Sequence, residues 1–239
     1  MKRIGVIGGM SWESSADYYR AINEHVATRL GGYHSADMVM VSVDFDPVEH
    51  MQREGRWDDA TELLIEAAHS CERAGAEVLL LATNTMHLVF DRLERATEAP
   101  WIHIADPTAR AAKAKGARVV GLLGTRFTME ESFYRERLAG RFGLKTVIPD
   151  QGDRELVHRV IFEELVKGTI RDASRRAYVQ VAGRLVDKGA EAVIFGCTEI
   201  GMLLSAEDVP VPALDTTRLH AEAAAAYALG EIDERGRTA

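Results

Sequence analysis

Short continuous runs of apolar residues alternate along this chain with longer amphipathic segments. The runs at 4–7, 38–43, 78–81, 119–123 and 192–195 have the length of buried strands. Apolar residues recur every three or four positions in the segments between them, at 14–29, 58–74, 86–96, 128–141, 153–167 and 172–188, and an Ala-rich segment at 216–229 reads as a last helix. Strands that alternate with helices predict βαβ units and a mainly parallel α/β fold.

Parts of the second half of the chain repeat parts of the first. Gly-Ala-Glu precedes an apolar run at 75–77 and again at 189–191, an offset of 189 − 75 = 114. The strand 5–8 matches 121–124 (121 − 5 = 116), and Tyr-Tyr-Arg at 18–20 matches Phe-Tyr-Arg at 133–135 (133 − 18 = 115). Parallel strands also resemble one another through composition alone. We interpret the matches as two copies of one unit, which predicts one domain from 1–104 with 211–239 and a second from 105–210.

Composition narrows the class of protein. The chain has 239 residues, and 29 Lys and Arg against 37 Asp and Glu give a net charge of −8, which argues against nucleic acid as a partner. No apolar run is long enough to cross a membrane, and the first strand does not read as a signal peptide. Two cysteines form neither a disulfide framework nor a cysteine zinc site, and they suggest a reducing cytoplasm.

Polar side chains follow the predicted strands, where open α/β sheets bind their ligands. The repeat gives Thr83 and Cys197 equivalent positions, since 197 − 83 = 114. If the two copies face each other, these side chains flank one cleft. Asn84, Thr85 and Thr198 lie beside them at predicted helix starts, where hydroxyl, amide and backbone donors suit a carboxylate.

Several features also have a simpler interpretation. Gly5, Gly8 and Gly9 could form a dinucleotide loop but lack its spacing. Cys71 lies inside a predicted helix, where packing is the expected role, and Cys197 alone could be a small buried apolar residue. The histidines His87, His103, His158 and His220 have no metal-ligand spacing, so we predict no metal site and assign them solvent-exposed or supporting roles.

Four motifs make the chain similar to the aspartate/glutamate racemase family along nearly its whole length. They are GVIGGMSWES at 5–14, ATNTMH at 82–87, LLGTRFTM at 122–129 and FGCTEIG at 195–201. The resemblance implies two flavodoxin-like parallel-sheet domains related by a pseudo-twofold axis, with the active site at their interface. It also implies a homodimer, a small amino acid as substrate and no cofactor.

Members of this family usually have cysteine at both strand ends, whereas this chain has Thr83 at the first. The resemblance implies that Cys197 acts on the L-face of the substrate and Thr83 on the D-face, with proton exchange biased to the L-enantiomer. A Cys thiolate is a usable base once its pKa falls below its free value of about 8.5, whereas a Thr alkoxide is scarcely populated near neutral pH. Fixed donors must also stabilise the dianionic carboxylate that develops.

The residues expected to bind the substrate follow from these motifs and from the strand ends. They are Gly9, Met10, Gln52, Arg53, Asn84, Thr85, Thr125 and Thr198, with Ser11 and Glu199 expected to support them.

Gln52 and Arg53 are our choice for the distal carboxylate of Asp or Glu, with Arg126 and Lys167 as alternatives. Related aspartate racemases use an arginine where this chain has Val48, and Lys167 is one residue out of register with their lysine. Arg53 could equally be an exposed surface residue.

Two other functions remain compatible with the sequence. A lyase resembling the arylmalonate decarboxylases needs only one cysteine, because that cysteine only protonates an enediolate after carbon dioxide leaves. A non-catalytic protein could keep the cleft to bind a small ligand after losing half of the acid/base pair.

Overall fold

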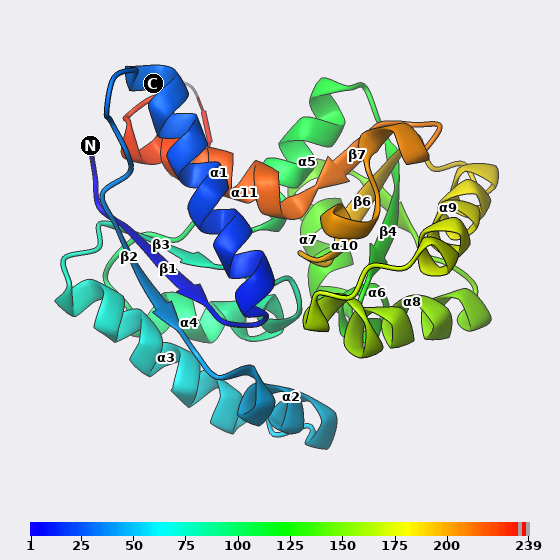
Figure 1. Cartoon of the computed structure of the whole chain (residues 1–239), viewed down its shortest axis with the longest axis horizontal. Coiled ribbons are helices and arrows are strands. Elements are labelled where there is room, and N and C mark those ends of the chain that lie inside the picture. Colours follow the sequence, from blue (N-terminus) through cyan, green and yellow to red (C-terminus); the bar gives the residue numbers. More distant parts are fainter. Residues whose placement is uncertain (234–235, 238–239) are drawn as a thin grey trace. The chain divides into compact units, whose positions relative to one another are not determined.

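The computed structural model describes residues 1–233 and 236–237 and divides them into two compact units. The first unit contains residues 1–104 and the chain from His220 onward, and the second contains residues 105–219. Figure 1 shows the course of the chain through both units. The first boundary coincides with the predicted one, whereas the chain returns to the first unit at His220 rather than at residue 211.

The first unit is built on a three-stranded parallel sheet of order β2-β1-β3. Its strands are β1 (Ile4–Gly8), β2 (Met38–Ser42) and β3 (Val78–Leu81). Its helical elements are α1 (Trp12–Leu30), α2 (Phe45–Glu54), α3 (Trp57–Arg73), the 3₁₀ helix η1 (Thr85–Val89) and α4 (Phe90–Ala96), and most of α11 (Thr216–Ala228) packs here as well.

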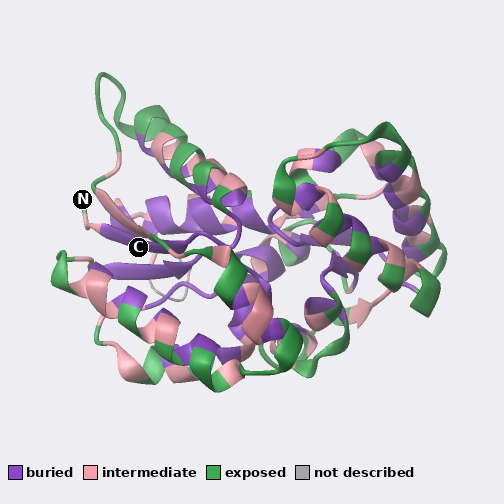
Figure 2. Ribbon diagram, turned by 60° about the horizontal axis from the view of Figure 1, so that its bottom comes forward, coloured by how far each residue is buried: buried purple, intermediate pink, exposed green. Residues whose placement is uncertain are grey.

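Alternation along β1 sends side chains into two hydrophobic cores, one on each face of the sheet. Ile4 and Val6 pack with residues of α1 and α11, whereas Ile7 packs with residues of α3. Because both faces are covered, β1 and β3 are buried along their whole length, which explains their continuous apolar sequences. Figure 2 shows these strands as buried and the outer helix faces as exposed.

The second unit contains a four-stranded parallel sheet of order β5-β4-β6-β7. Its strands are β4 (Val119–Gly124), β5 (Lys145–Val147), β6 (Ala192–Gly196) and β7 (Ala213–Asp215). Its helical elements are α5 (Ala105–Ala114), α6 (Arg126–Glu130), α7 (Ser132–Phe142), α8 (Gln151–Glu163), η2 (Leu165–Lys167), α9 (Asp172–Asp187), α10 (Ile200–Leu203) and η3 (Ala206–Asp208).

The two sheets share the order that the internal repeat implies. In the first sheet β1 lies between β2 and β3, and in the second β4 lies between β5 and β6. β3 and β6 are the two strands that follow the repeated Gly-Ala-Glu. Tyr18 and Tyr134 are both fully buried, whereas Phe133, which the sequence comparison matches to Tyr18, is only partly buried.

Three predicted boundaries differ from the structure. The segment 128–141 is two helices, α6 and α7, separated at Glu131, whose extended backbone ends the first and caps the second. The start of the helix predicted at 86–96 is the 3₁₀ helix η1. The predicted limit at 210 omitted β7, which pairs with β6 and keeps the chain in the second unit up to residue 219.

None of the helices in the described part of the chain is both long enough and apolar enough to cross a membrane.

Candidate active site

The turn after β1 places Gly9, Met10 and Ser11 at the carboxyl end of the first sheet. Ser11 caps α1, its hydroxyl oxygen accepting from the Ser14 N–H at 3.4 Å. The Ser15 hydroxyl donates to the Ser11 carbonyl at 2.7 Å and accepts from the Gly9 N–H at 2.8 Å. These bonds hold the turn tightly against the start of α1, with Ser11 as the helix cap.

Gly9 allows this turn to lie against the end of β2. It has φ +94°, and a Cβ built there would lie 2.1 Å from the Val43 carbonyl oxygen. Only glycine satisfies both the conformation and the close approach. Met10 is almost completely buried beside this turn, in the core that also contains Val48.

Thr83, Asn84 and Thr85 follow β3 and are all buried at the same end of the sheet. His87, one helical turn after Thr83, donates from Nδ1 to the Thr83 carbonyl oxygen at 2.7 Å. Its Nε2 accepts from the Ile104 N–H at 3.2 Å. One ring nitrogen therefore donates and the other accepts, which fixes His87 as the neutral Nδ1–H tautomer.

A second buried histidine holds the same chain segment. Nε2 of His220 donates to the Ile102 carbonyl oxygen at 2.6 Å, and the Tyr18 hydroxyl donates to its Nδ1 at 2.8 Å. The His103 ring packs against that of His87, with centroids 4.4 Å apart. The sequence left these histidines as solvent-exposed or supporting residues, and the structure buries them as supports of Thr83 and of residues 102–104. The i, i+4 spacing of Thr83 and His87 in the ATNTMH motif was the available signal.

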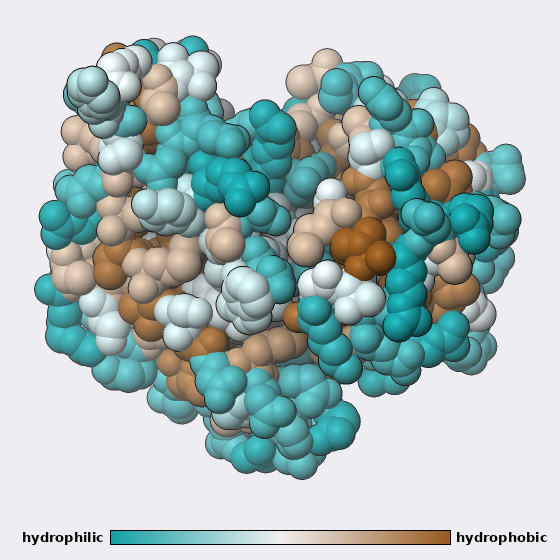
Figure 3. Space-filling view, viewed as in Figure 1, coloured by the Kyte–Doolittle hydropathy of each residue, from teal (hydrophilic) through white to brown (hydrophobic). Residues whose placement is uncertain are grey.

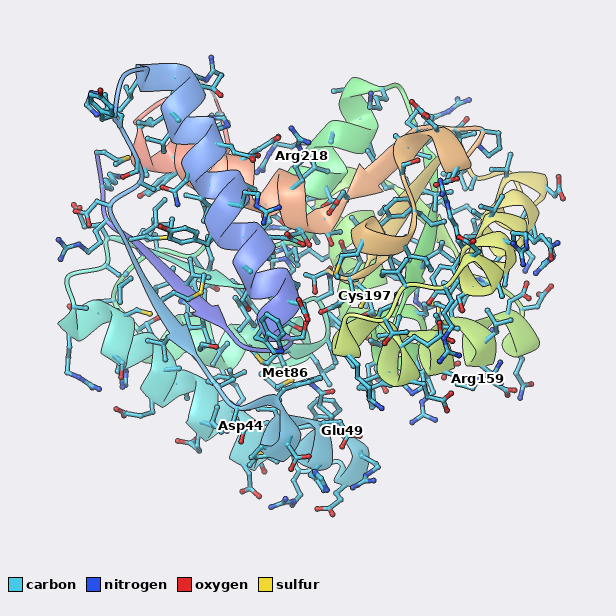
Figure 4. All side chains as sticks on the ribbon, viewed as in Figure 1. Asp44, Glu49, Met86, Arg159, Cys197 and Arg218 are labelled. Atoms are coloured by element: carbon cyan, nitrogen blue, oxygen red, sulfur yellow. The ribbon has the colours of Figure 1, made fainter. Side chains whose placement is uncertain are left out.

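Gln52 and Arg53 point to different sides of α2. Gln52 is buried and its amide Nε2 donates to the Met86 Sδ at 3.2 Å, whereas the Arg53 side chain is exposed. Figure 4 labels Met86, together with Asp44, which caps the start of α2, and Glu49 in the middle of α2. Consecutive helical residues are rotated by about 100°, so α2 can turn only one of the two inward, and it turns Gln52.

Cys197 directly follows β6 in the second unit, and its side chain is 7% exposed (Figure 4). Its Sγ donates to Oε2 of Glu199 at 2.9 Å, and the Thr198 hydroxyl donates to the same oxygen at 2.9 Å. Glu199 is itself buried. This carboxylate therefore touches Cys197 directly, a closer role than the support predicted for it, and the Thr198 hydroxyl is engaged with Glu199 rather than open to a ligand.

The pKa of the Cys197 thiol lies well above its ordinary value. Burial is the largest cause, followed by the negative charge of Glu199 and by the hydrogen bond to that carboxylate, while the backbone N–H groups of Glu199 and Thr198 act in the opposite direction. At neutral pH the proton thus stays on sulfur in this substrate-free state. For Cys197 to act as a base, its pKa must therefore fall when a substrate binds, because burial and the neighbouring Glu199 both favour the protonated thiol.

One further side chain, that of Tyr178, belongs to the surroundings of Cys197. Tyr178, in the same hydrophobic core, donates from its hydroxyl to the Val157 carbonyl at 2.8 Å. Its pKa is raised well above the usual value, first by burial and also by the negative charges of Glu164 and Glu199. Tyr178 thus stays neutral, and nothing in its sequence context singled it out.

The residues after β4 offer fewer candidate ligand-binding groups than the sequence suggested. Thr125 caps α6, its hydroxyl oxygen accepting from the Thr128 N–H at 3.3 Å. Arg126 and Lys167, the alternatives for a distal carboxylate, have exposed side chains in the second unit. Thr125 is therefore placed at the strand end as predicted, and a helix cap accounts for its residue type.

Cys71 contrasts with Cys197. It lies in α3 with no exposed surface, in the hydrophobic core that faces Ile7. Burial raises its pKa to about 11, so the thiol stays protonated and packs as a small apolar residue. In the described part of the chain, no three or more His, Cys, Asp or Glu side chains are grouped as a metal ion would require.

Comparisons with known proteins show which family the chain is similar to. Residues 7–224 match the family model for the Asp/Glu/Hydantoin racemases. A crystal structure of a candidate Asp/Glu racemase from Yersinia pestis is 52% identical, with a TM-score of 0.88 over 96% of this chain and 100% of that one. An aspartate racemase homologue from Pyrococcus horikoshii is 34% identical, with a TM-score of 0.80 over the same shares. The broad specificity amino-acid racemase RacX of Bacillus subtilis is 20% identical over 90% of this chain and 92% of its own length.

These matches define a class of isomerase, the racemases. The chain belongs to the Asp/Glu/Hydantoin racemase family.

Proposed function

We propose that this racemase inverts acidic amino acids without a cofactor, with Cys197 acting on the α-carbon of the L-enantiomer and Thr83 on that of the D-enantiomer. The observation that carries the proposal is the buried Cys197, whose Sγ donates to the buried Glu199 at 2.9 Å. A thiol with an adjacent carboxylate can both lose and regain a proton. Thr83, which ends the equivalent strand of the first unit, supplies the second proton-bearing group.

Each proton in the reaction has a donor and an acceptor. The Cys197 thiol passes its proton to Glu199, and the resulting thiolate removes the α-proton of the L-substrate. The carbanion takes a proton from the Thr83 hydroxyl, directly or through a water, on the opposite face, and solvent returns a proton to Thr83 as Glu199 releases its own. The positive ammonium group of a bound amino acid favours this first transfer, because a nearby cation stabilises the thiolate.

Thr83 makes the two directions of proton exchange unequal. A Thr hydroxyl is a far weaker acid than a thiol, so the D-face step is slow. Enantiomers have equal free energy, so kcat/KM for inversion must be equal in the two directions. Exchange of the α-proton with solvent has no such restriction. The L-enantiomer is therefore expected to exchange its α-proton faster than it inverts.

The substrate carboxylates need fixed donors. Asn84 and Thr85 are buried at the start of η1, next to Thr83, and we assign them to the α-carboxylate with the backbone of Gly9 and Met10. Gln52 is our candidate for the distal carboxylate. Its amide now donates to the Met86 sulfur, a weak acceptor that a carboxylate oxygen would replace favourably. This scheme gives only supporting roles to Arg53, Thr125 and Thr198.

The single thiol also suits a lyase that protonates an enediolate, so the test must separate the two reactions. The protein is incubated in heavy water with L- and D-aspartate and L- and D-glutamate, and α-deuteration and enantiomer content are followed together. Deuteration of the L-form ahead of inversion supports the racemase. Absence of exchange with every amino acid, with release of carbon dioxide from an aryl malonate, would replace it with the lyase.

We further propose that the enzyme works as a homodimer in the reducing cytoplasm. Both cysteines are free and buried, which suits such a compartment.

A further inference from the structure

The backbone of Thr83 is held at both of its polar groups. Its N–H donates to the Leu81 carbonyl at 2.8 Å, and its carbonyl accepts from Nδ1 of His87 at 2.7 Å. The backbone N–H of His87 donates to Asn84 instead, at 3.1 Å, so the imidazole ring makes the bond to Thr83. Because threonine is branched at Cβ and has few χ1 rotamers, the position of the Thr83 hydroxyl follows from that of its backbone.

The other side of the His87 ring is anchored to a segment that is itself held in place. Nε2 of His87 accepts from the Ile104 N–H at 3.2 Å, and the nearby Ile102 carbonyl accepts from Nε2 of His220 at 2.6 Å. The Tyr18 hydroxyl completes the network by donating to Nδ1 of His220 at 2.8 Å. The network thus runs from α1 through α11 and the segment between the two isoleucines to the end of β3.

All three side chains of this network lie inside the first unit. Tyr18 and His220 have no exposed surface, and His87 is 3% exposed. Water solvates hydrophilic side chains on the surface, such as those over α2 in Figure 3, but it does not reach these buried rings. A buried polar group that loses its hydrogen-bond partner destabilises the fold. The network therefore holds the end of β3 in a single geometry.

We propose that His87 is a positioning residue for proton transfer on the D-face. By holding the Thr83 carbonyl, its ring keeps the Thr83 hydroxyl where it can protonate the α-carbon. The proposal rests on the proposed function, in which Thr83 gives its proton to the carbanion. A threonine hydroxyl is a weak acid, so this step depends strongly on position. A displacement of about 1 Å can slow such a step by about 100-fold.

The carbanion formed from an L-amino acid has two fates in heavy water, and their ratio isolates the role of His87. Return of deuterium from Cys197 on the L-face gives the deuterated L-form, whereas delivery from Thr83 on the opposite face gives the D-form. The initial rate of D-form production divided by that of L-form deuteration therefore measures the step at Thr83. Because both products come from one intermediate, the ratio does not depend on the folded fraction of the protein or on substrate affinity.

Two substitutions of His87 separate the bond to Thr83 from general stability. His87→Phe keeps a ring but loses this bond, and we expect the ratio to fall at least about tenfold. His87→Asn is expected to keep a ratio close to that of the wild type. An asparagine amide can donate to the carbonyl four residues earlier, as Asn23 does to Tyr19 at 2.8 Å. Both variants lose the bond to Ile104, so a loss of stability alone would affect them alike.

His69→Phe is the matched control. The His69 ring also donates to a backbone carbonyl, that of Ala96 at the end of α4, at 2.8 Å, and no residue assigned to the site lies beside Ala96 in the sequence. This variant is expected to be less stable and to keep the wild-type ratio.

The outcomes separate the positioning role from the proposed function. An unchanged ratio in His87→Phe, or in His87→Leu where the phenylalanine variant does not fold, would overturn the positioning role. Equal losses in His87→Phe and His87→Asn would also overturn it. Absence of L-side exchange in the wild type would instead overturn the proposed function, and the positioning role with it.

Discussion

The contact between Cys197 and Glu199 makes a quantitative prediction for Glu199→Gln. The substitution keeps the shape of the side chain and removes the charge that raises the pKa of the Cys197 thiol. With about 4 Å between the sulfur and the centre of the carboxylate charge, and an effective dielectric constant of about 20, two unit charges repel by about 4 kcal/mol. Removing this repulsion should lower the pKa of Cys197, while burial, the largest cause of its raised value, continues to act on the thiol.

The thiolate can be followed directly by its ultraviolet absorbance during a pH titration and by its rate of alkylation. Cys197→Ala provides the blank, because Cys71 is buried and titrates only near its pKa of about 11. Glu199→Asp keeps the charge and is expected to keep a raised pKa. Circular dichroism checks that each variant is folded. An unchanged or higher pKa of Cys197 in Glu199→Gln would refute the assignment of Glu199 as the group that holds the thiol proton.

The other predictions concern stability and inversion. Gly9→Ala should destabilise the protein by about 3 kcal/mol, because the new Cβ would lie 2.1 Å from the Val43 carbonyl oxygen. Gly31→Ala should cost about 1 kcal/mol, because Gly31 also has a positive φ, +69°, but has open space around its Cβ position. Chemical denaturation measures both losses, and equal losses would contradict the packing argument. His87→Phe keeps a ring beside Phe90 but removes the hydrogen bonds to Thr83 and Ile104, so the free energy of unfolding in urea should fall by about 2 kcal/mol. The same substitution at His34, whose side chain is exposed, should leave it unchanged. Folding raises the pKa of the Cys71 thiol from 9.0 to about 11, so the protonated thiol stabilises the folded protein fully below pH 9 and loses this effect as the pH rises towards 11. The free energy of unfolding should therefore fall by about 3 kcal/mol between pH 9 and pH 11. Cys71→Ala should remove this part of the pH dependence of stability. Thr83→Cys should raise the rate of inversion relative to L-side exchange, as measured by chiral chromatography, and an unchanged ratio would remove Thr83 from the D-face.

The strands and their polar ends were predictable because a buried parallel strand needs a continuous apolar sequence. The internal repeat gives Thr83 and Cys197 equivalent positions from the sequence alone. β5 and β7 are only three residues long, too short to show a period, so the sequence missed them and set the return to the first unit too early. Gln52 and Arg53 were equivalent in the sequence, and only the rotation of α2 against its sheet separates them.

The chemistry around Cys197 was harder to predict, because it depends on one side-chain rotation. The CTE motif placed Glu199 near the thiol, but only the turn after β6 brings its Oε2 to 2.9 Å from the sulfur. That contact adds to burial, which is the larger cause, in raising the pKa of the thiol. The role of His87 was also hard to predict, because its second hydrogen bond is accepted from the N–H of Ile104, which lies 17 residues away in the sequence.

Exchange of the L-aspartate and L-glutamate α-proton with heavy water tests the central claim most directly. The account predicts that the wild-type enzyme deuterates at least one of these L-amino acids faster than it produces the D-form, and that Cys197→Ala abolishes this exchange while Cys71→Ala keeps it. Full exchange activity in Cys197→Ala would contradict the account.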